Sequence, residues 1–196
     1  MTARERLLAG AATLTRSRGV GGTTVAELLA EAGVARRSLY VNFPGGRDEV
    51  IAAATEQSGA ELTDALLQLF TESGDILAAM DAYLAATAAD LVASDYTAGC
   101  PIVAAALGGT EVPLARDAAG RIFGQWQTLL AGALELSGVP AERAPGLAML
   151  ILSSAEGATA MAIAQRSTEP LDQVGVLLRS LVADAIATST DAGAPD

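Results

Sequence analysis

The sequence predicts an all-α protein, with a three-helix N-terminal helix-turn-helix head on a larger helical bundle. Apolar residues recur with the 3.6-residue period of amphipathic helices, and no run shows the strict alternation of a half-buried strand. Glycine and proline clusters divide this pattern into helix-sized segments. A length of 196 residues fits one domain or two small ones. We expect the head to cover residues 1–46 and the bundle residues 47–196.

The head is expected to contain three helices, of which the first covers about residues 3–18. The second follows Thr24-Val-Ala-Glu27, which fits a capping box, and it stops at Gly33. The third runs from about Ala35 to Asn42 and is halted by Pro44-Gly-Gly46. Two short helices joined by a glycine-containing turn of three or four residues form a helix-turn-helix.

The bundle is expected to consist of long helices separated by glycine- and proline-containing breaks. Asp48 and Glu49 open the first of them, where acidic side chains complement the helix dipole. The expected ranges are about 48–70, 75–94, 112–136, 141–166 and 171–188.

The composition argues against an enzyme. There is no histidine and no lysine, so a Ser-His or Cys-His nucleophile pair, an imidazole metal site and Schiff-base chemistry are all excluded. A carboxylate-only metal site or acid–base pair is still formally possible, but the chain shows no motif for either. We therefore expect no catalytic residues, no metal and no cofactor.

The sequence also indicates a cytoplasmic protein without a membrane span. The longest charge-free run, residues 96–110, is interrupted by glycine and proline and is shorter than the ~20 apolar residues that a span needs. No signal peptide is readable at the N-terminus. Cys100 is the only cysteine, so an internal disulfide is impossible and a reducing compartment is the natural location.

Charge is distributed unevenly along the chain, and this points to an anionic partner for the head. Residues 1–47 contain seven arginines and three acids, a net charge of +4, whereas residues 48–196 carry −15. In a helix-turn-helix the second helix of the pair enters the major groove of DNA with its N-terminal residues leading. An alternative interpretation is that the arginines form an ordinary solvated face.

Candidate DNA contacts follow from the expected third helix. Arg36 and Arg37 occupy its leading turn, and arginine can bind guanine O6 and N7 or a phosphate. Ser38 and Asn42 share another face, and asparagine pairs naturally with adenine. The remaining candidates are phosphate contacts, namely Tyr40, Arg47 and Thr24 at the start of the preceding helix.

The run from Thr23 to Val50 resembles the DNA-binding head of TetR-family bacterial regulators. Its specific part is Ser38-Leu-Tyr-x-Asn-Phe43, followed by Pro-Gly-Gly, a basic residue and an acidic residue. The family commonly has histidine at the position of Asn42 and lysine at that of Arg47, and it often has serine at that of Ala35. Three further segments resemble the LmrA/YxaF-like subgroup: Gly99-Cys-Pro-Ile-Val103, Glu156-Gly-Ala158 and Ser167-Thr-Glu-Pro-Leu171.

The resemblance implies a homodimer whose last two long helices, about 141–166 and 171–188, form a four-helix interface. Apolar residues such as Leu150, Ile151, Leu177 and Leu178 support this interface independently. The resemblance also implies a small-molecule pocket in the bundle. Its candidate residues are Tyr83, Phe123, Trp126, Met149 and Glu156, for which ordinary core packing is the alternative. Glu156 faces either this pocket or the partner subunit.

We therefore expect a transcriptional repressor that binds a palindromic double-stranded DNA operator as a homodimer and is released by a small-molecule effector. One alternative is a ligand-binding helical dimer whose degenerate head does not bind DNA. A second alternative is an enzyme with a carboxylate-based site, which the composition disfavours. Activation in place of repression is a further possibility, because the sequence does not reveal the position of the operator.

Overall fold

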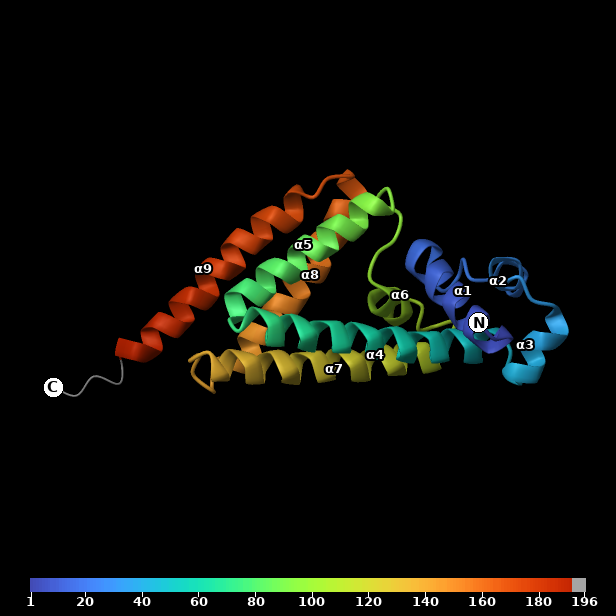
Figure 1. Ribbon diagram of the computed structural model, residues 1–196, viewed down its shortest axis with the longest axis horizontal. Coiled ribbons are helices and arrows are strands. Elements are labelled where there is room, and N and C mark those ends of the chain that lie inside the picture. The colour runs from blue at the N-terminus through green and yellow to red at the C-terminus, as the bar shows by residue number, and fades with distance from the viewer. Residues whose placement is uncertain (192–196) are drawn as a thin grey trace. The chain divides into compact units, whose positions relative to one another are not determined.

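The computed structural model describes residues 1–191, and all regular secondary structure within them is α-helical (Figure 1). This confirms the predicted fold class. Most helix ends lie within three residues of the predicted positions. The helices are α1 (Ala3–Arg18), α2 (Val25–Ala32), α3 (Arg36–Asn42), α4 (Arg47–Ser73), α5 (Ile76–Ala93), α6 (Pro101–Leu107), α7 (Pro113–Leu136), α8 (Ala144–Gln165) and α9 (Glu169–Asp191).

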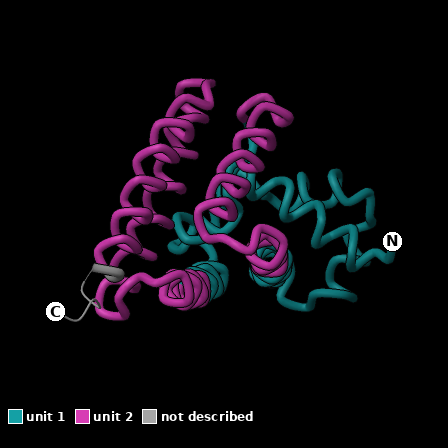
Figure 2. The backbone as a smooth tube through the Cα atoms, turned by 60° about the vertical axis from the view of Figure 1, so that its left-hand side comes forward, with its two compact units in different colours: residues 1–62, 97–123 teal, residues 63–96, 124–196 magenta. Residues whose placement is uncertain are grey.

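The chain forms two compact units, and α4 and α7 each contribute residues to both (Figure 2). The first unit comprises residues 1–62 and 97–123, and the second comprises residues 63–96 and the described part of 124–196. The sequence boundary at 46/47 coincides with the start of α4. Packing divides the molecule differently, because Val50 and Ala54 of α4 belong to the same apolar core as α1, α2 and α3.

The core of the first unit fixes the helix-turn-helix. Leu7 of α1, Leu28 of α2 and Leu39 of α3 are completely buried in one cluster, and Phe43 after α3 closes it. The predicted capping box at Thr24 and Glu27 is present at the start of α2. Gly33 ends α2 in the left-handed conformation, with φ 61° and ψ 41°, which glycine adopts without steric cost. A three-residue turn, 33–35, therefore leads directly into α3.

Helix α6 was not predicted from the sequence. Its seven residues lie between Gly99 and Gly108, and proline occupies its first position, where the missing N–H costs no hydrogen bond. Ile102 and Ala105 are completely buried. The loop before α6 is attached to α1, because Arg16 Nε donates to the Gly99 carbonyl at 3.0 Å and the Gly99 amide donates to the Arg16 carbonyl at 3.2 Å.

The second unit is a helical bundle built from α5, α8, α9 and parts of α4 and α7. Its larger core cluster includes Met80, Leu134, Ala148 and Val182. By length and composition α5 and α8 could each cross a membrane. Here they pack against the other helices of the bundle, and Asp81 of α5 forms an ion pair with Arg179 of α9. Such a charged pair is expensive in lipid, and this favours a bundle in water.

Candidate functional site

Helix α3 presents a basic, exposed face. Arg36 and Arg37 in its first turn are exposed, and so are Tyr40 and Val41 one turn later. The opposite face is fixed by Leu39, which is fully buried. No acidic residue lies in the segment from Gly33 to Arg47. The arrangement predicted for a groove-reading helix, with arginines leading and the apolar anchor inward, is therefore present in the structure.

Arg36 and Arg37 differ from the other arginines of the chain. All twelve arginines lie in the part of the chain that the structure describes, and these two form no hydrogen bond, ion pair or ring contact within it. The other ten do have such partners. They are Arg4, Arg6, Arg16, Arg18, Arg47, Arg116, Arg121, Arg143, Arg166 and Arg179. The guanidinium groups without an internal partner are thus the two at the leading turn of α3.

Ser38 and Asn42 lie on a half-buried side of α3. The Asn42 side-chain amide donates a hydrogen bond of 2.8 Å to the Ser38 carbonyl, so one of its two amide hydrogens is used within the helix. Sequence reasoning missed Val41, which is 70% exposed and follows Arg37 by one turn. The i, i+4 spacing from Arg37 was the available signal. Together these side chains form a surface with both polar and apolar contact groups.

Thr24 is exposed at the N-terminus of α2, but its hydroxyl already forms hydrogen bonds within the first turn of that helix. Its hydroxyl donates to the Glu27 carboxylate at 2.9 Å, and the Glu27 amide donates back to that hydroxyl at 3.2 Å. The side-chain and backbone hydrogen bonds from Thr24 hold the pKa of Glu27 below its ordinary value of 4.5. The Glu27 carboxylate therefore lies beside the first turn of α2, where a phosphate was expected.

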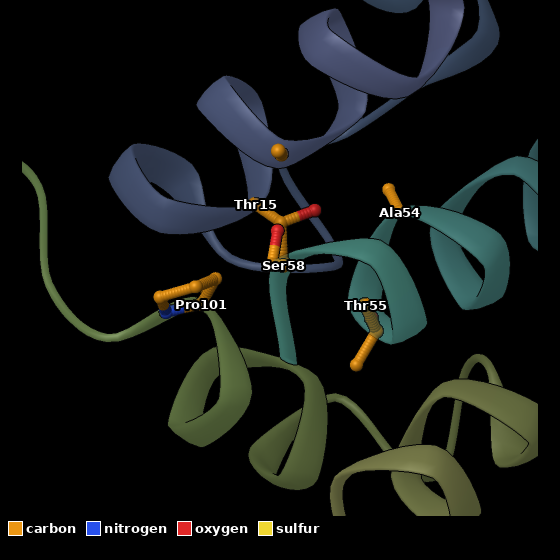
Figure 3. Close-up of a pocket in the computed structure, with 6 residues that line it drawn as sticks. Thr15, Ala54, Thr55, Ser58 and Pro101 are labelled. Carbon is orange, nitrogen blue, oxygen red and sulfur yellow. The ribbon is translucent and has the colours of Figure 1, made fainter. Parts of the chain in front are cut away.

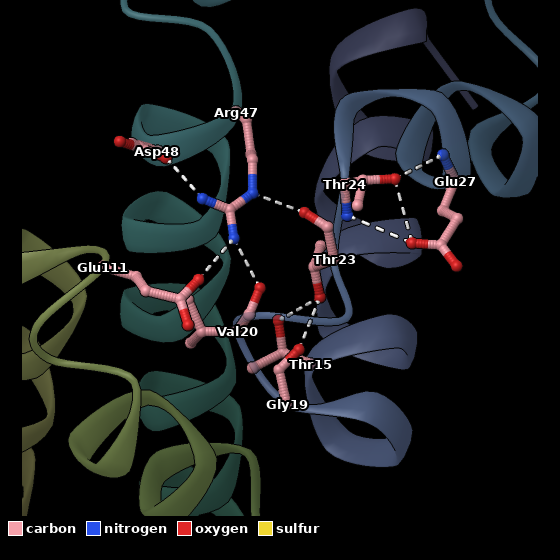
Figure 4. A network of polar contacts seen from close by, with 9 residues as sticks. All are labelled: Thr15, Gly19, Val20, Thr23, Thr24, Glu27, Arg47, Asp48 and Glu111. Carbon is pink, nitrogen blue, oxygen red and sulfur yellow. Dashed lines mark hydrogen bonds and ion pairs between the residues drawn. The ribbon is translucent and has the colours of Figure 1, made fainter.

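Arg47, which the sequence suggested as a phosphate contact, has several hydrogen-bond and ion-pair partners within the first unit (Figure 4). Its side chain is only 19% exposed. Nε donates to the Thr23 carbonyl at 2.5 Å, and one terminal nitrogen donates to the Val20 carbonyl at 2.5 Å and pairs with Glu111 at 3.5 Å. The other terminal nitrogen pairs with Asp48 at 2.9 Å. These internal acceptors surround the guanidinium, so a phosphate contact by Arg47 would compete with them.

One of the five residues considered for a ligand pocket, Trp126, lines a small cavity. The cavity has a volume of about 40 Å³ and lies in the second unit. The other residues that line it are Leu66, Leu67, Phe70, Leu129, Leu130 and Leu152. The Trp126 indole donates a 2.8 Å hydrogen bond to Thr63, which lies in the same unit. Typical ligand pockets occupy roughly 300–1,000 Å³, so this cavity is too small to hold such a ligand without enlargement.

The other four pocket candidates have separate surroundings. Tyr83 is half-buried against the cluster that contains Ala155 and Ala158, and Glu156 of α8 is also half-buried. Met149 is 55% exposed on the outside of α8. Phe123 is half-buried and belongs to the first unit. In that unit the small hollow at Thr15, Ala54, Thr55, Ser58 and Pro101 has no room even for a water molecule (Figure 3).

Helices α8 and α9 each expose large apolar side chains, and these are only partly the residues expected at an interface. Leu147, Ile151, Leu178 and Val182 pack inside the bundle. Three residues directly beside them in sequence, Leu150, Leu177 and Leu181, are exposed. The exposed apolar residues of α8 and α9 are Met149, Leu150, Met161, Val176, Leu177 and Leu181.

Comparisons with known proteins agree with this architecture. Residues 7–54 match the family described as bacterial regulatory proteins, tetR family, and residues 76–176 match the C-terminal domain of transcriptional regulators described as LmrA/YxaF-like. An HTH-type transcriptional regulator of Mycobacterium tuberculosis is 34% identical over 185 residues, which cover 91% of this chain and 93% of that protein.

Two further comparisons cover nearly the whole chain. The HTH-type transcriptional regulator YxaF of Bacillus subtilis is 28% identical over 182 residues, or 90% of this chain and 95% of that protein. A crystal structure of a TetR transcriptional regulator from Legionella pneumophila superposes with a TM-score of 0.82 at 19% identity, covering 92% of this chain and 97% of that one. At this identity the superposition shows a shared fold.

Proposed function

The chain belongs to the TetR family of bacterial transcriptional regulators, and we propose that it represses transcription by binding a palindromic DNA operator as a homodimer. In this proposal a small-molecule effector releases the protein from DNA. Regulators of this kind are not enzymes, and the protein has to reach chromosomal DNA, so its place is the cytoplasm.

The observation that carries the proposal is the pair of arginines at the start of α3. Arg36 and Arg37 are exposed and lack internal partners in the described chain, so they reach DNA without breaking an existing contact. A bidentate arginine–guanine contact discriminates by ~1–3 kcal/mol. Ser38, Asn42 and Tyr40 supply polar contacts on either side, and Val41 is placed to pack against a thymine methyl group. At Thr24 we propose a phosphate contact through backbone amides of α2, because the hydroxyl is engaged with Glu27.

Dimerisation is supported by the exposed apolar residues of α8 and α9. Six large apolar side chains on two helices would be costly to leave in water, and such surfaces mark protein–protein contacts. A two-fold axis through this interface would relate the head of one subunit to the head of the other. Two α3 helices then read two half-sites about one turn of DNA apart, ~34–36 Å, or somewhat further. A palindromic operator follows from that symmetry.

Effector release is supported by the small apolar cavity beside Trp126. A ligand changes the protein only by its different affinity for two conformations, so an effector that opens this cavity would favour the open form. Helix α4 lines the cavity with Leu66, Leu67 and Phe70 and begins in the head at Arg47. Movement of α4 is therefore the proposed link between the effector and the head. Of the pocket candidates from the sequence, Trp126 is the one that this proposal uses.

The test is selection of genomic DNA fragments by the purified protein, followed by salt titration of the selected site. A palindromic fragment should emerge. If each head makes about four phosphate contacts, log K should fall with log[salt] with a slope of about −7 for the dimer. Enrichment of no fragment, or a slope near zero, would favour the alternative of a ligand-binding dimer with a degenerate head.

A further inference from the structure

The loop before α2 is held by Arg47 from the first turn of α4. Arg47 donates to the carbonyl groups of Val20 and Thr23, both in the loop between α1 and α2. Thr23 is fully buried, and its hydroxyl donates to the Gly19 carbonyl at 2.9 Å. Thr24, the next residue, caps α2. Because α2 leads into α3 through a three-residue turn, this loop directly precedes the two helices of the helix-turn-helix.

The corner between α6 and α7 lies against the same loop. Glu111 pairs with the terminal nitrogen of Arg47 that also donates to Val20. A Cβ atom on Gly108 would lie 2.3 Å from Val20 Cγ2, so the corner and the loop are in close contact. A Cβ atom on Gly21 would lie 3.0 Å from a Glu111 carboxylate oxygen. The corner and α4 therefore meet the loop at one place, around the Arg47 guanidinium (Figure 4).

We propose that Arg47 is a positioning residue for DNA recognition and that Glu111 acts through it, so that the α6–α7 corner controls the placement of the helix-turn-helix. This inference rests on the proposed function. Arginine suits the task because its planar fork reaches several acceptors in fixed directions, which a lysine ammonium cannot do from one nitrogen. A shift of the corner would change the acceptors of Arg47 and thereby the loop that precedes α2.

The direction of the Glu111 effect separates positioning from general electrostatics. Removing a negative charge from the first unit should strengthen binding to polyanionic DNA if charge alone matters. Under our proposal Glu111→Gln instead weakens binding, because Arg47 loses an anchor. Glu56→Gln is the matched control, since it removes the same charge from the same unit and breaks an ion pair with Arg121 that does not involve the loop.

The experiment measures operator affinity at several salt concentrations for the wild type, Arg47→Gln, Arg47→Lys, Glu111→Gln, Glu56→Gln and the double variant Arg47→Gln/Glu111→Gln. Arg47→Gln should lose at least about tenfold in affinity, as expected for a lost charge-assisted contact, with the salt slope unchanged. Arg47→Lys should recover only part of this loss. The single variant Glu111→Gln should bind more weakly than the wild type. The double variant should bind no more weakly than Arg47→Gln alone.

Several results would overturn the inference. A direct phosphate contact predicts that Arg47→Gln lowers the salt slope by about 0.9 per contact, roughly 1.8 per dimer, and that Arg47→Lys binds normally. Binding by Glu111→Gln that is as tight as that of Glu56→Gln would show that the corner is not coupled to the head. If the Arg47 variants do not fold, the comparison of Glu111→Gln with Glu56→Gln decides. If the wild-type protein binds no DNA fragment, the proposed function itself is wrong. That result is distinct from the outcomes that contradict the role of Arg47 and Glu111.

Discussion

Thr24 and Glu27 hydrogen-bond to each other in both directions across the first turn of α2. The Glu27 amide donates to the Thr24 hydroxyl at 3.2 Å, and the Glu27 carboxylate accepts from the Thr24 amide at 3.2 Å and from its hydroxyl at 2.9 Å. Arg18 also donates to this carboxylate at 2.8 Å. The two residues thus fix the start of the helix that carries the turn into α3.

This pair predicts a measurable pKa change. The Thr24 hydrogen bonds favour the ionised carboxylate and lower the pKa of Glu27 below 4.5, so Thr24→Ala should raise it toward that value. The folded-state pKa is depressed, so the stabilisation is present above 4.5 and is lost as the pH falls through the lowered pKa. Carbon-detected NMR titration of the Glu27 carboxyl measures the shift. Thr13→Ala, at an exposed position of α1, is the control, and equal midpoints in both variants would contradict the prediction.

The close packing around Gly108 predicts that a larger residue at this position lowers the stability of the fold. An added methyl group meets the Val20 side chain at 2.3 Å, so Gly108→Ala should lower the free energy of unfolding by about 1–3 kcal/mol. Adding Val20→Ala should recover part of that loss by making room. The control is Gly120→Ala in α7, because a Cβ atom at this position has no neighbour within 4 Å. This substitution should raise the free energy of unfolding by about 0.5–1 kcal/mol, since alanine favours the helix more than glycine does. Urea unfolding distinguishes these cases, and equal effects at both glycines would refute the close contact.

If the exposed apolar residues of α8 and α9 form the dimer interface, a charged side chain introduced among them should disrupt the dimer. Leu177 is 70% exposed, so Leu177→Glu should leave the subunit folded and shift the protein to monomer. Leu136→Glu, at a position that is 92% exposed near the end of α7, should leave the dimer intact. Sedimentation equilibrium with circular dichroism measures association and folding together. A dimer that tolerates Leu177→Glu as well as Leu136→Glu would place the interface elsewhere.

The sequence was sufficient to predict the helices whose signals are local. Thr24, Glu27 and Gly33 mark the ends of α2 through hydrogen bonds and backbone conformation within a few residues. Helix α6 lacks such signals, because its flanking glycines and Pro101 equally indicate a break in helical structure. Its formation depends on burying Ile102 and Ala105, which is tertiary information.

The same distinction between local signals and tertiary contacts applies to the residues of the candidate site. The leading position of Arg36 and Arg37 follows from local spacing, and the structure places both on the exposed face as expected. Arg47 could not be interpreted from spacing, because its acceptors at Val20, Thr23 and Glu111 come from two other loops. Leu150 and Ile151 are adjacent and equally apolar, so only packing shows that the first faces outward and the second inward.

The most direct measurement compares operator affinity of the double variant Arg36→Gln/Arg37→Gln with that of Arg116→Gln/Arg121→Gln. Both remove two positive charges from exposed arginines of the first unit, but only the first pair lies on α3. We predict a loss of at least about 100-fold for the α3 variant, from lost base contacts of ~1–3 kcal/mol each, and a small loss for the control. Equal affinity of the two variants would contradict the assignment of α3 as the DNA-reading helix.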